Sequence, residues 1–141
     1  MGTISKNFSY REFEASETAD QLDICNVIID TQVRDAVKAL VQTVLQPLRD
    51  AWNKPLHINS GYRCKRLNEL VGGTPTSQHT KGEAADIACD EPWELAKLAK
   101  DLGLPYDQMI LYPTFVHFSH KLNGDQRRAV LYNRRYRGPR L

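Results

Sequence analysis

The 141-residue sequence lacks any long apolar run. No segment approaches the roughly 20 apolar residues that span a bilayer. With 41% hydrophobic and 26% charged residues, the composition is typical of a globular domain and excludes a disordered chain. The N-terminus also lacks the basic start and long apolar stretch of a secretory signal. We therefore expect one domain over residues 1–141, a monomer without a membrane span that is cytoplasmic as synthesised.

Close-spaced cysteine pairs are also missing. The odd set of Cys25, Cys64 and Cys89 favours reduced thiols over a disulfide framework. The net charge of +2 is too small to indicate nucleic-acid binding, although seven Lys or Arg residues follow residue 120 against one acid, Asp125. These arginines gather at one terminus of the chain, so we expect no nucleic-acid partner. The basic residues of this segment are expected to form a solvent-exposed surface, or alternatively to attract an anionic polymer.

The longest apolar stripe predicts the main core helix. Apolar residues recur at three- and four-residue steps up to Trp52, and Asp30 or Thr31 is the predicted N-cap. Pro47 lies within this helix and should bend it, because proline removes an N–H donor and crowds the preceding turn.

Shorter elements are predicted on both sides of this helix. The predicted helices follow a Ser9 cap, cover residues 66–70 and run from about residue 92 to Gly103, while residues 18–26 are predicted as a loop. The predicted strands are residues 56–60, 84–88, 109–111, 115–119 and 129–132, the last three antiparallel. No strand-helix-strand unit repeats. The pattern favours an α+β fold with helices packed on a small antiparallel sheet, in which residues 121–141 form a basic hairpin strand and tail.

Histidine and aspartate residues in the second half of the chain suit a metal site. His79 and Asp86 could face one point, because Gly82 between them allows a tight bend. Catalytic zinc commonly takes three protein ligands, and the third must be His117 or His120. Side chains alternate across a strand, so only one of the two is expected to reach the metal. His120 lies at the expected strand end, and we choose His117.

Residues 77–86 read SQHTKGEAAD and match the pattern S-x-H-x-x-G-x-A-x-D. This pattern resembles the signature of the zinc D-alanyl-D-alanine carboxypeptidases, peptidoglycan metallopeptidases of the hedgehog/DD-peptidase fold. The resemblance covers most of the chain, through residues 45–49, 60–63, 67–68, 71–73 and 115–119 in the same order. The sequence is most similar to the small single-domain members of bacteria and their phages.

The resemblance implies one Zn²⁺ ion held by His79, Asp86 and His117, with Arg63 and Ser77 near the substrate carboxylate or peptide backbone. It implies hydrolysis of a peptide bond in peptidoglycan stem peptides, as a D-Ala-D-Ala carboxypeptidase or an L-Ala-D-Glu type endopeptidase. An endolysin of this kind would meet the wall after phage-type release or lysis. A guanidinium can hold a carboxylate through two charge-assisted hydrogen bonds, whereas Ser77 could equally cap the turn before His79.

The sequence departs from the family at the catalytic acid or base. Relatives carry Glu or Asp a few residues before the last zinc histidine, but residues 108–116 contain no acid. Tyr112 stands where small phage-type members have Glu and could act as a weaker proton donor. Asp107 or Glu83 could instead reach in from a neighbouring strand or loop. The alternative function is a non-catalytic, zinc-stabilised module that binds the cell wall or belongs to a phage particle.

Overall fold

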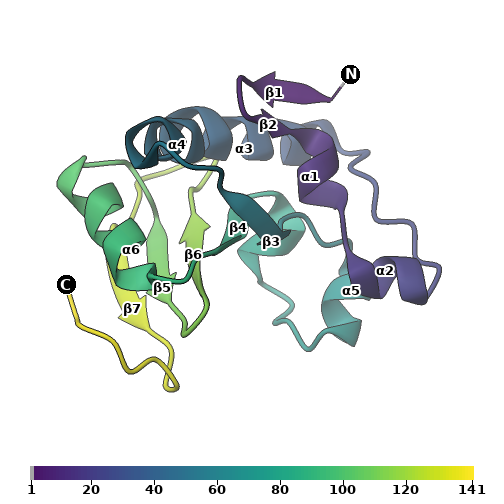
Figure 1. The fold of residues 1–141 in the computed structure, drawn as a ribbon. Coiled ribbons are helices and arrows are strands. Elements are labelled where there is room, and N and C mark those ends of the chain that lie inside the picture. Colours follow the sequence, from purple (N-terminus) through teal and green to yellow (C-terminus); the bar gives the residue numbers. More distant parts are fainter. Residues whose placement is uncertain (1) are drawn as a thin grey trace.

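The computed structural model describes residues 2–141 as an α+β fold with a five-stranded sheet and a separate two-stranded one (Figure 1). In chain order the elements are β1 (Thr3–Ser5), β2 (Phe8–Ser9), α1 (Tyr10–Glu14), α2 (Glu17–Gln21), α3 (Thr31–Leu40), η1 (Val41–Leu45), α4 (Gln46–Trp52), β3 (His57–Ser60), α5 (Lys65–Leu70), η2 (Gln78–Lys81), β4 (Ala84–Ala88), α6 (Pro92–Asp101), β5 (Gln108–Leu111), β6 (Phe115–Ser119) and β7 (Ala129–Tyr132). Within residues 2–141, none of the helices is both long and apolar enough for a membrane crossing.

The N-terminal region confirms one helix and corrects one loop. Ser9 caps α1, and its backbone N–H donates in return to the Glu12 carboxylate, which completes a capping box. The loop predicted for residues 18–26 is wrong in its first part, because α2 begins at Glu17 under a Ser16 cap. Only Ala19 of this helix is buried, so α2 is too short to produce a visible apolar period.

The long core helix begins as predicted and contains a wider turn before Pro47. The Asp30 carboxylate accepts hydrogen bonds from two backbone N–H groups of the first turn, as an N-cap does. The π turn η1 separates α3 from α4, and the Gln46 N–H donates to the Val41 carbonyl. Proline cannot bond the carbonyl four residues earlier and crowds it, here that of Thr43. The π turn relieves this crowding within a continuous helical segment.

The main sheet has the order β3-β4-β6-β5-β7, and its last pair is parallel. The prediction that residues 129–132 form an antiparallel hairpin strand is therefore wrong. β7 does run opposite to β6, but β4 and β5 already occupy both edges of β6. β7 instead pairs with the free edge of β5, and since β5 is antiparallel to β6, the β5–β7 pair is parallel.

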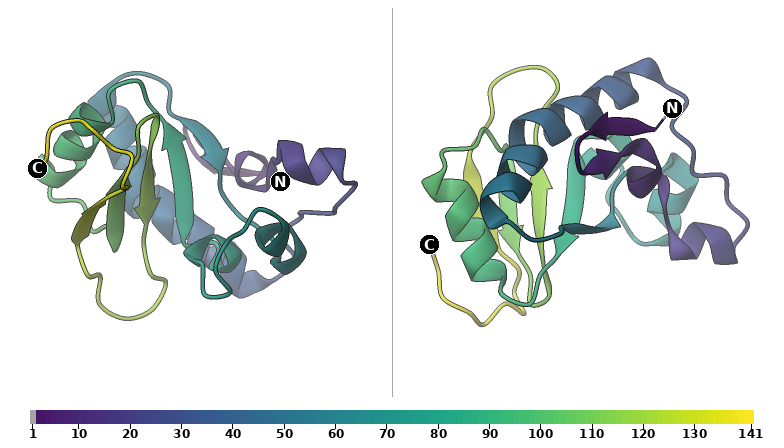
Figure 2. Two further views of the ribbon diagram at one scale, coloured as in Figure 1. Left: turned by 90° about the horizontal axis from the view of Figure 1, so that it is seen from below. Right: turned by 45° about the horizontal axis from the view of Figure 1, so that its top comes forward.

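The two faces of the sheet differ because side chains alternate along each strand. One face packs against α3, η1, α4 and α6 through buried apolar side chains, among them Ile87, Val116, Phe118 and Met109. Figure 2 shows the long helical segment behind the strands when the molecule is viewed from below. On the opposite face, the register aligns Ser60, Asp86, His117 and Ile110 in one row across β3, β4, β6 and β5. This row contains polar side chains, so the face opposite the helices is the one that can carry a site.

Candidate metal centre

The three predicted metal ligands converge on the sheet face opposite the helices. Asp86 on β4 and His117 on β6 are direct cross-strand partners, and η2 places His79 beside them. One potential ligand atom from each residue lies within 4.8 Å of the other two. The two imidazole rings meet edge to face, with 5.1 Å between their centroids. His120, the histidine rejected from the predicted set, lies just past β6 and does not join this group.

Gly82 turns the chain from His79 into the strand that carries Asp86. It ends η2 with φ of 74°, a left-handed conformation that glycine adopts without strain. A Cβ atom at this position would lie 2.6 Å from the Val33 carbonyl oxygen on α3. The tight bend predicted here therefore also requires a close approach to the core helix.

Backbone contacts orient the His79 ring. Its Nδ1 lies 2.7 Å from the Gly61 carbonyl oxygen, which can only accept, so Nδ1 carries the proton. Nε2 of the neutral ring then has a free lone pair, and it lies 3.4 Å from Asp86 Oδ1. Metal-binding histidines commonly donate their other ring N–H to a backbone carbonyl in this way. Two imidazole nitrogens and one carboxylate oxygen are a donor set that zinc accepts.

The Asp86 carboxylate is prepared for the ionised state. Its burial favours the neutral acid, but its contacts with the His117 and His79 rings outweigh this effect and hold the pKa of Asp86 below its ordinary value. The bond from His117 Nδ1 to Asp86 Oδ1 measures 2.8 Å. A carboxylate must be deprotonated to bind a metal, and Asp86 meets that condition at neutral pH.

These three side chains lie in an open cleft of about 470 Å³ that Arg63, Ser77 and Tyr112 also line. Arg63 donates from Nε to Ser60 Oγ at 3.2 Å and from Nη1 to Asn68 Oδ1 at 3.0 Å. These contacts fix the guanidinium plane and leave further N–H donors for a bound anion.

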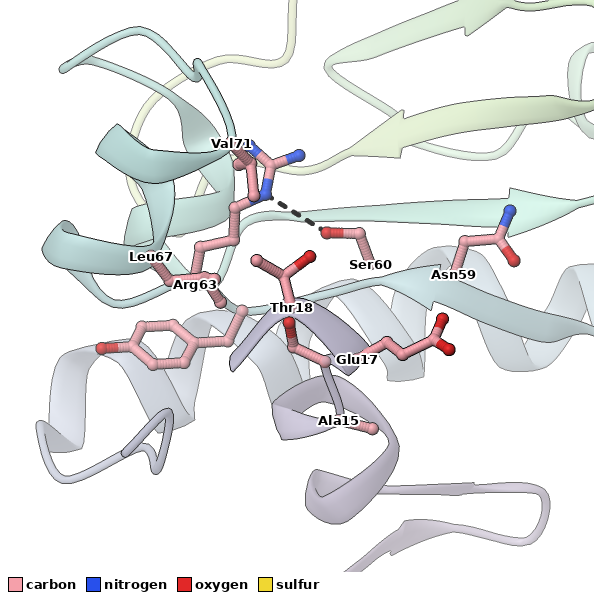
Figure 3. Close-up of a pocket in the computed structure, with 10 residues that line it drawn as sticks. Ala15, Glu17, Thr18, Asn59, Ser60, Arg63, Leu67 and Val71 are labelled. Atoms are coloured by element: carbon pink, nitrogen blue, oxygen red, sulfur yellow. Dashed lines mark hydrogen bonds between the residues drawn. The ribbon is translucent and has the colours of Figure 1, made fainter. Parts of the chain in front are cut away.

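A second pocket of about 310 Å³ is also lined by Arg63. Figure 3 shows Glu17 and Thr18 of α2 along this pocket, with Arg63 bonded to Ser60. Arg63 therefore lines both hollows.

Ser77 performs the capping role that the sequence left open. Its Oγ accepts from the His79 backbone N–H at 3.2 Å and so caps η2. The hydroxyl hydrogen is not used in this contact, and Ser77 lines the cleft. The same side chain can thus hold the His79 backbone and donate a hydrogen bond into the cleft.

The candidate proton carriers occupy three different environments. Tyr112 lines the cleft and stacks on Phe115, with 4.1 Å between ring centroids. Burial and the Asp86 charge raise the pKa of Tyr112, so it remains a protonated phenol at neutral pH. Asp107 is fully buried, does not line the cleft and accepts from Arg127, while Glu83 accepts from Gln78 and the Leu122 backbone N–H. Among the described residues lining the cleft, Asp86 is the only carboxylate.

Comparison with known proteins identifies the family. The family model of Peptidase M15 matches residues 6–119. The chain belongs to the peptidase M15 family. The zinc D-Ala-D-Ala carboxypeptidase of Streptomyces albus G is 34% identical over 86 residues, which cover 59% of this chain and 34% of that protein. The chain thus spans about a third of the length of this curated relative.

The residues of this cleft that the sequence prediction missed include three with long polar side chains: Gln78, Gln108 and Arg127. Gln78 lies beside His79 within the ten-residue signature, and Gln108 shares a strand face with Tyr112, so both carried a positional signal. Arg127 carried none, because it was assigned to the basic tail. Its place at the cleft depends on an ion pair with Asp107, twenty residues earlier.

Proposed function

We propose that this M15 domain is a zinc-dependent peptidase that hydrolyses peptide bonds in peptidoglycan stem peptides. The observation that carries the proposal is the convergence of His79, Asp86 and His117 in an open cleft beside a fixed guanidinium. The zinc D-Ala-D-Ala carboxypeptidase activity named for the relative supports the same chemistry. The bond cleaved is the D-Ala-D-Ala bond or an L-Ala-D-Glu type bond, and both present a free carboxylate next to the cleaved bond.

His79, Asp86 and His117 would hold the zinc ion. When bound, zinc supplies Lewis acidity at the scissile carbonyl and lowers the pKa of water toward about 7. The Gly61 carbonyl keeps the His79 ring in the tautomer that exposes Nε2, and the contact with His117 favours the ionised Asp86 carboxylate. The protein therefore presents a pre-oriented ligand set before any ion binds.

Arg63 would bind the substrate carboxylate. Ser60 and Asn68 accept two of its N–H groups, so the guanidinium loses little freedom when it forms a two-point contact with a carboxylate. The Ser77 hydroxyl, held over η2, would donate to a carbonyl of the peptide. These contacts would place the cleaved bond over the ligand set.

Tyr112 is the proposed proton donor to the leaving amine. The titratable side chains described in the cleft are Tyr112, the two arginines and the three candidate metal ligands. The raised pKa of Tyr112 favours proton donation over proton abstraction. We propose that Asp107, the other candidate, is structural, since its two oxygens accept from Arg127 and Gln78. Without a carboxylate base, turnover would be slow. That same gap favours the second candidate function, a non-catalytic zinc module of the cell wall or a phage particle.

The test is to incubate zinc-loaded protein with purified wall fragments over about pH 6 to 9, where a zinc-acidified water would act, and to follow the products by mass spectrometry. The proposal expects release of D-Ala or cleavage after L-Ala, and no product from an Asp86→Ala variant. A protein that holds near-stoichiometric zinc but yields no product would support the non-catalytic module. A protein that binds no zinc would refute both functions.

A further inference from the structure

A fully buried carboxylate holds Arg127 beside the metal cleft. Asp107 has no exposed surface, and its Oδ1 accepts from the Arg127 backbone N–H at 2.8 Å and from Nε at 3.1 Å. Its Oδ2 accepts from Arg127 Nη2 at 2.7 Å. Charge-assisted contacts of this paired kind fix both the position and the plane of a guanidinium.

The same carboxylate connects Arg127 to the metal centre. Gln78, the neighbour of His79, donates from Nε2 to Asp107 Oδ2 at 3.1 Å and also contacts Glu83 Oε1 at 3.2 Å. Lys121 Nζ lies 3.9 Å from Asp107 Oδ1. The Arg127 guanidinium is therefore held at a defined place relative to the His79 side of the cleft.

Arg127 lines the cleft and retains donors that no described residue uses. A guanidinium has five N–H donors, and Asp107 engages the one on Nε and one on Nη2. The remaining three have no hydrogen-bond partner in the described part of the chain. The Arg127 side chain is 50% exposed and lines the same cleft as Arg63. Asp107 thus holds the half-exposed guanidinium of Arg127 in a fixed position where a ligand in the cleft can contact it.

The two cleft arginines come from opposite edges of one sheet. Arg63 follows β3 and Arg127 precedes β7, and the register places both at the end of the sheet where Ala84 and Ser119 pair. Four inter-strand spacings of about 4.8 Å separate β3 from β7, roughly 19 Å. An extended peptide advances about 3.4 Å per residue. Two groups several residues apart on one peptide therefore suit the two guanidiniums better than one carboxylate does.

We propose that Arg127 forms a second carboxylate-binding subsite of this cleft. In this arrangement, which applies to cleavage of the D-Ala-D-Ala bond, Arg63 takes the C-terminal carboxylate of the stem peptide. Arg127 takes a free carboxylate on the N-terminal side of the cleaved bond, the α-carboxylate of a γ-linked D-glutamate. The subsite rests on the proposed peptidase function. It makes the domain selective for stem peptides in which this carboxylate is free and not amidated.

The experiment uses two synthetic peptides, L-Ala-γ-D-Glu-L-Lys-D-Ala-D-Ala and the same peptide with the D-Glu α-carboxylate converted to the amide. Calorimetry measures their binding to the metal-free full chain, and kinetics measure kcat and KM of the zinc-loaded protein. Arg127→Gln should weaken binding of the carboxylate peptide about tenfold or more, raise its KM, and leave the amide peptide unchanged. Arg134→Gln, with the same charge change outside the cleft, should match the wild type for both.

Arg127→Gln leaves the buried Asp107 without its ion-pair partner and can destabilise the protein, so a second variant is needed. Arg127→Lys keeps the positive charge but loses the two-point contact, so it should fold and still show a reduced preference for the carboxylate peptide. Equal losses for both peptides in both variants, or no loss at all, would overturn the subsite. If the wild type cleaves both peptides equally well and Arg127→Gln does the same, only the subsite fails. If the wild type neither binds nor cleaves either peptide, the proposed function fails with it.

Discussion

His79 Nε2 lies 3.4 Å from Asp86 Oδ1, and both atoms carry free lone pairs when the ring is neutral. The Gly61 carbonyl fixes this tautomer by accepting the Nδ1 proton. Two acceptors that face each other at this distance are favourable only with a cation or a proton between them. His117 offers a third potential ligand atom, and the three atoms lie within 4.8 Å of one another.

Zinc should therefore stabilise the fold. Binding to the folded state at about 100 times the Kd contributes about 2.7 kcal/mol, which would raise Tm by roughly 5 to 10 °C for a chain of this size. Thermal unfolding with zinc and after addition of a chelator measures the effect. Asp86→Ala should abolish the zinc-dependent rise, whereas Asp90→Ala, an exposed acid after β4, should keep it. An equal rise in both variants would contradict the assigned ligands.

Gly82→Ala should destabilise the protein by more than the usual cost of a left-handed alanine. The added Cβ meets the Val33 carbonyl at 2.6 Å, and φ is 74°. We expect a loss of about 2 kcal/mol or more in urea unfolding, together with weaker zinc binding, because the bend carries His79 toward Asp86. Gly103→Ala is the control, since φ is 66° there and no atom lies within 4 Å. Equal losses would show that the contact with α3 is unimportant.

The Asp107–Arg127 ion pair should make the free energy of unfolding depend on pH in the acidic range. Burial alone would raise the pKa of Asp107, but hydrogen bonds and charge from Arg127 lower it to about 2, below the value of about 3.9 in the unfolded chain. Its contribution, on the order of 2 kcal/mol, is present above about pH 4 and is lost as the pH falls toward 2. Urea unfolding of metal-free protein at several pH values measures this. The stability difference between wild type and Asp107→Asn should shrink over that range, and a constant difference would argue against the ion pair.

Tyr112 variants test the proton donor. Tyr112→Phe keeps the stacking on Phe115 but removes the hydroxyl, so kcat should fall about tenfold or more while zinc content stays constant. Tyr112→Glu supplies a carboxylate in the cleft and should raise kcat and shift the pH profile to lower pH. If neither variant changes kcat or the profile, Tyr112 has no part in proton transfer.

The convergence of His79, Asp86 and His117 could be predicted because its determinants are local. Residues 77–86 contain His79, the Gly82 bend and Asp86, and alternation along one strand separates His117 from His120. The core helix and the five strands of the main sheet were also visible, since the helix carries a regular apolar stripe and each strand is a short, mostly apolar run.

The missed features depend on which segments meet in space. β7 pairs in parallel with β5 because both edges of β6 are occupied. The hydrophobic pattern of residues 129–132 does not show which strand β7 pairs with. Arg127 reaches the cleft through the buried Asp107, a partner distant in sequence. The short helix α2 buries one residue, Ala19, and so leaves no pattern.

The most direct test of the central claim is mass spectrometry of the pentapeptide L-Ala-γ-D-Glu-L-Lys-D-Ala-D-Ala after incubation with protein that holds about one zinc ion per chain. Asp86→Ala protein serves as the control. The account predicts a product that has lost the terminal D-Ala or is cut after L-Ala, formed by the wild type and absent with the variant. An intact pentapeptide in the presence of zinc-loaded wild type would contradict the claim that this domain is a peptidase of stem peptides.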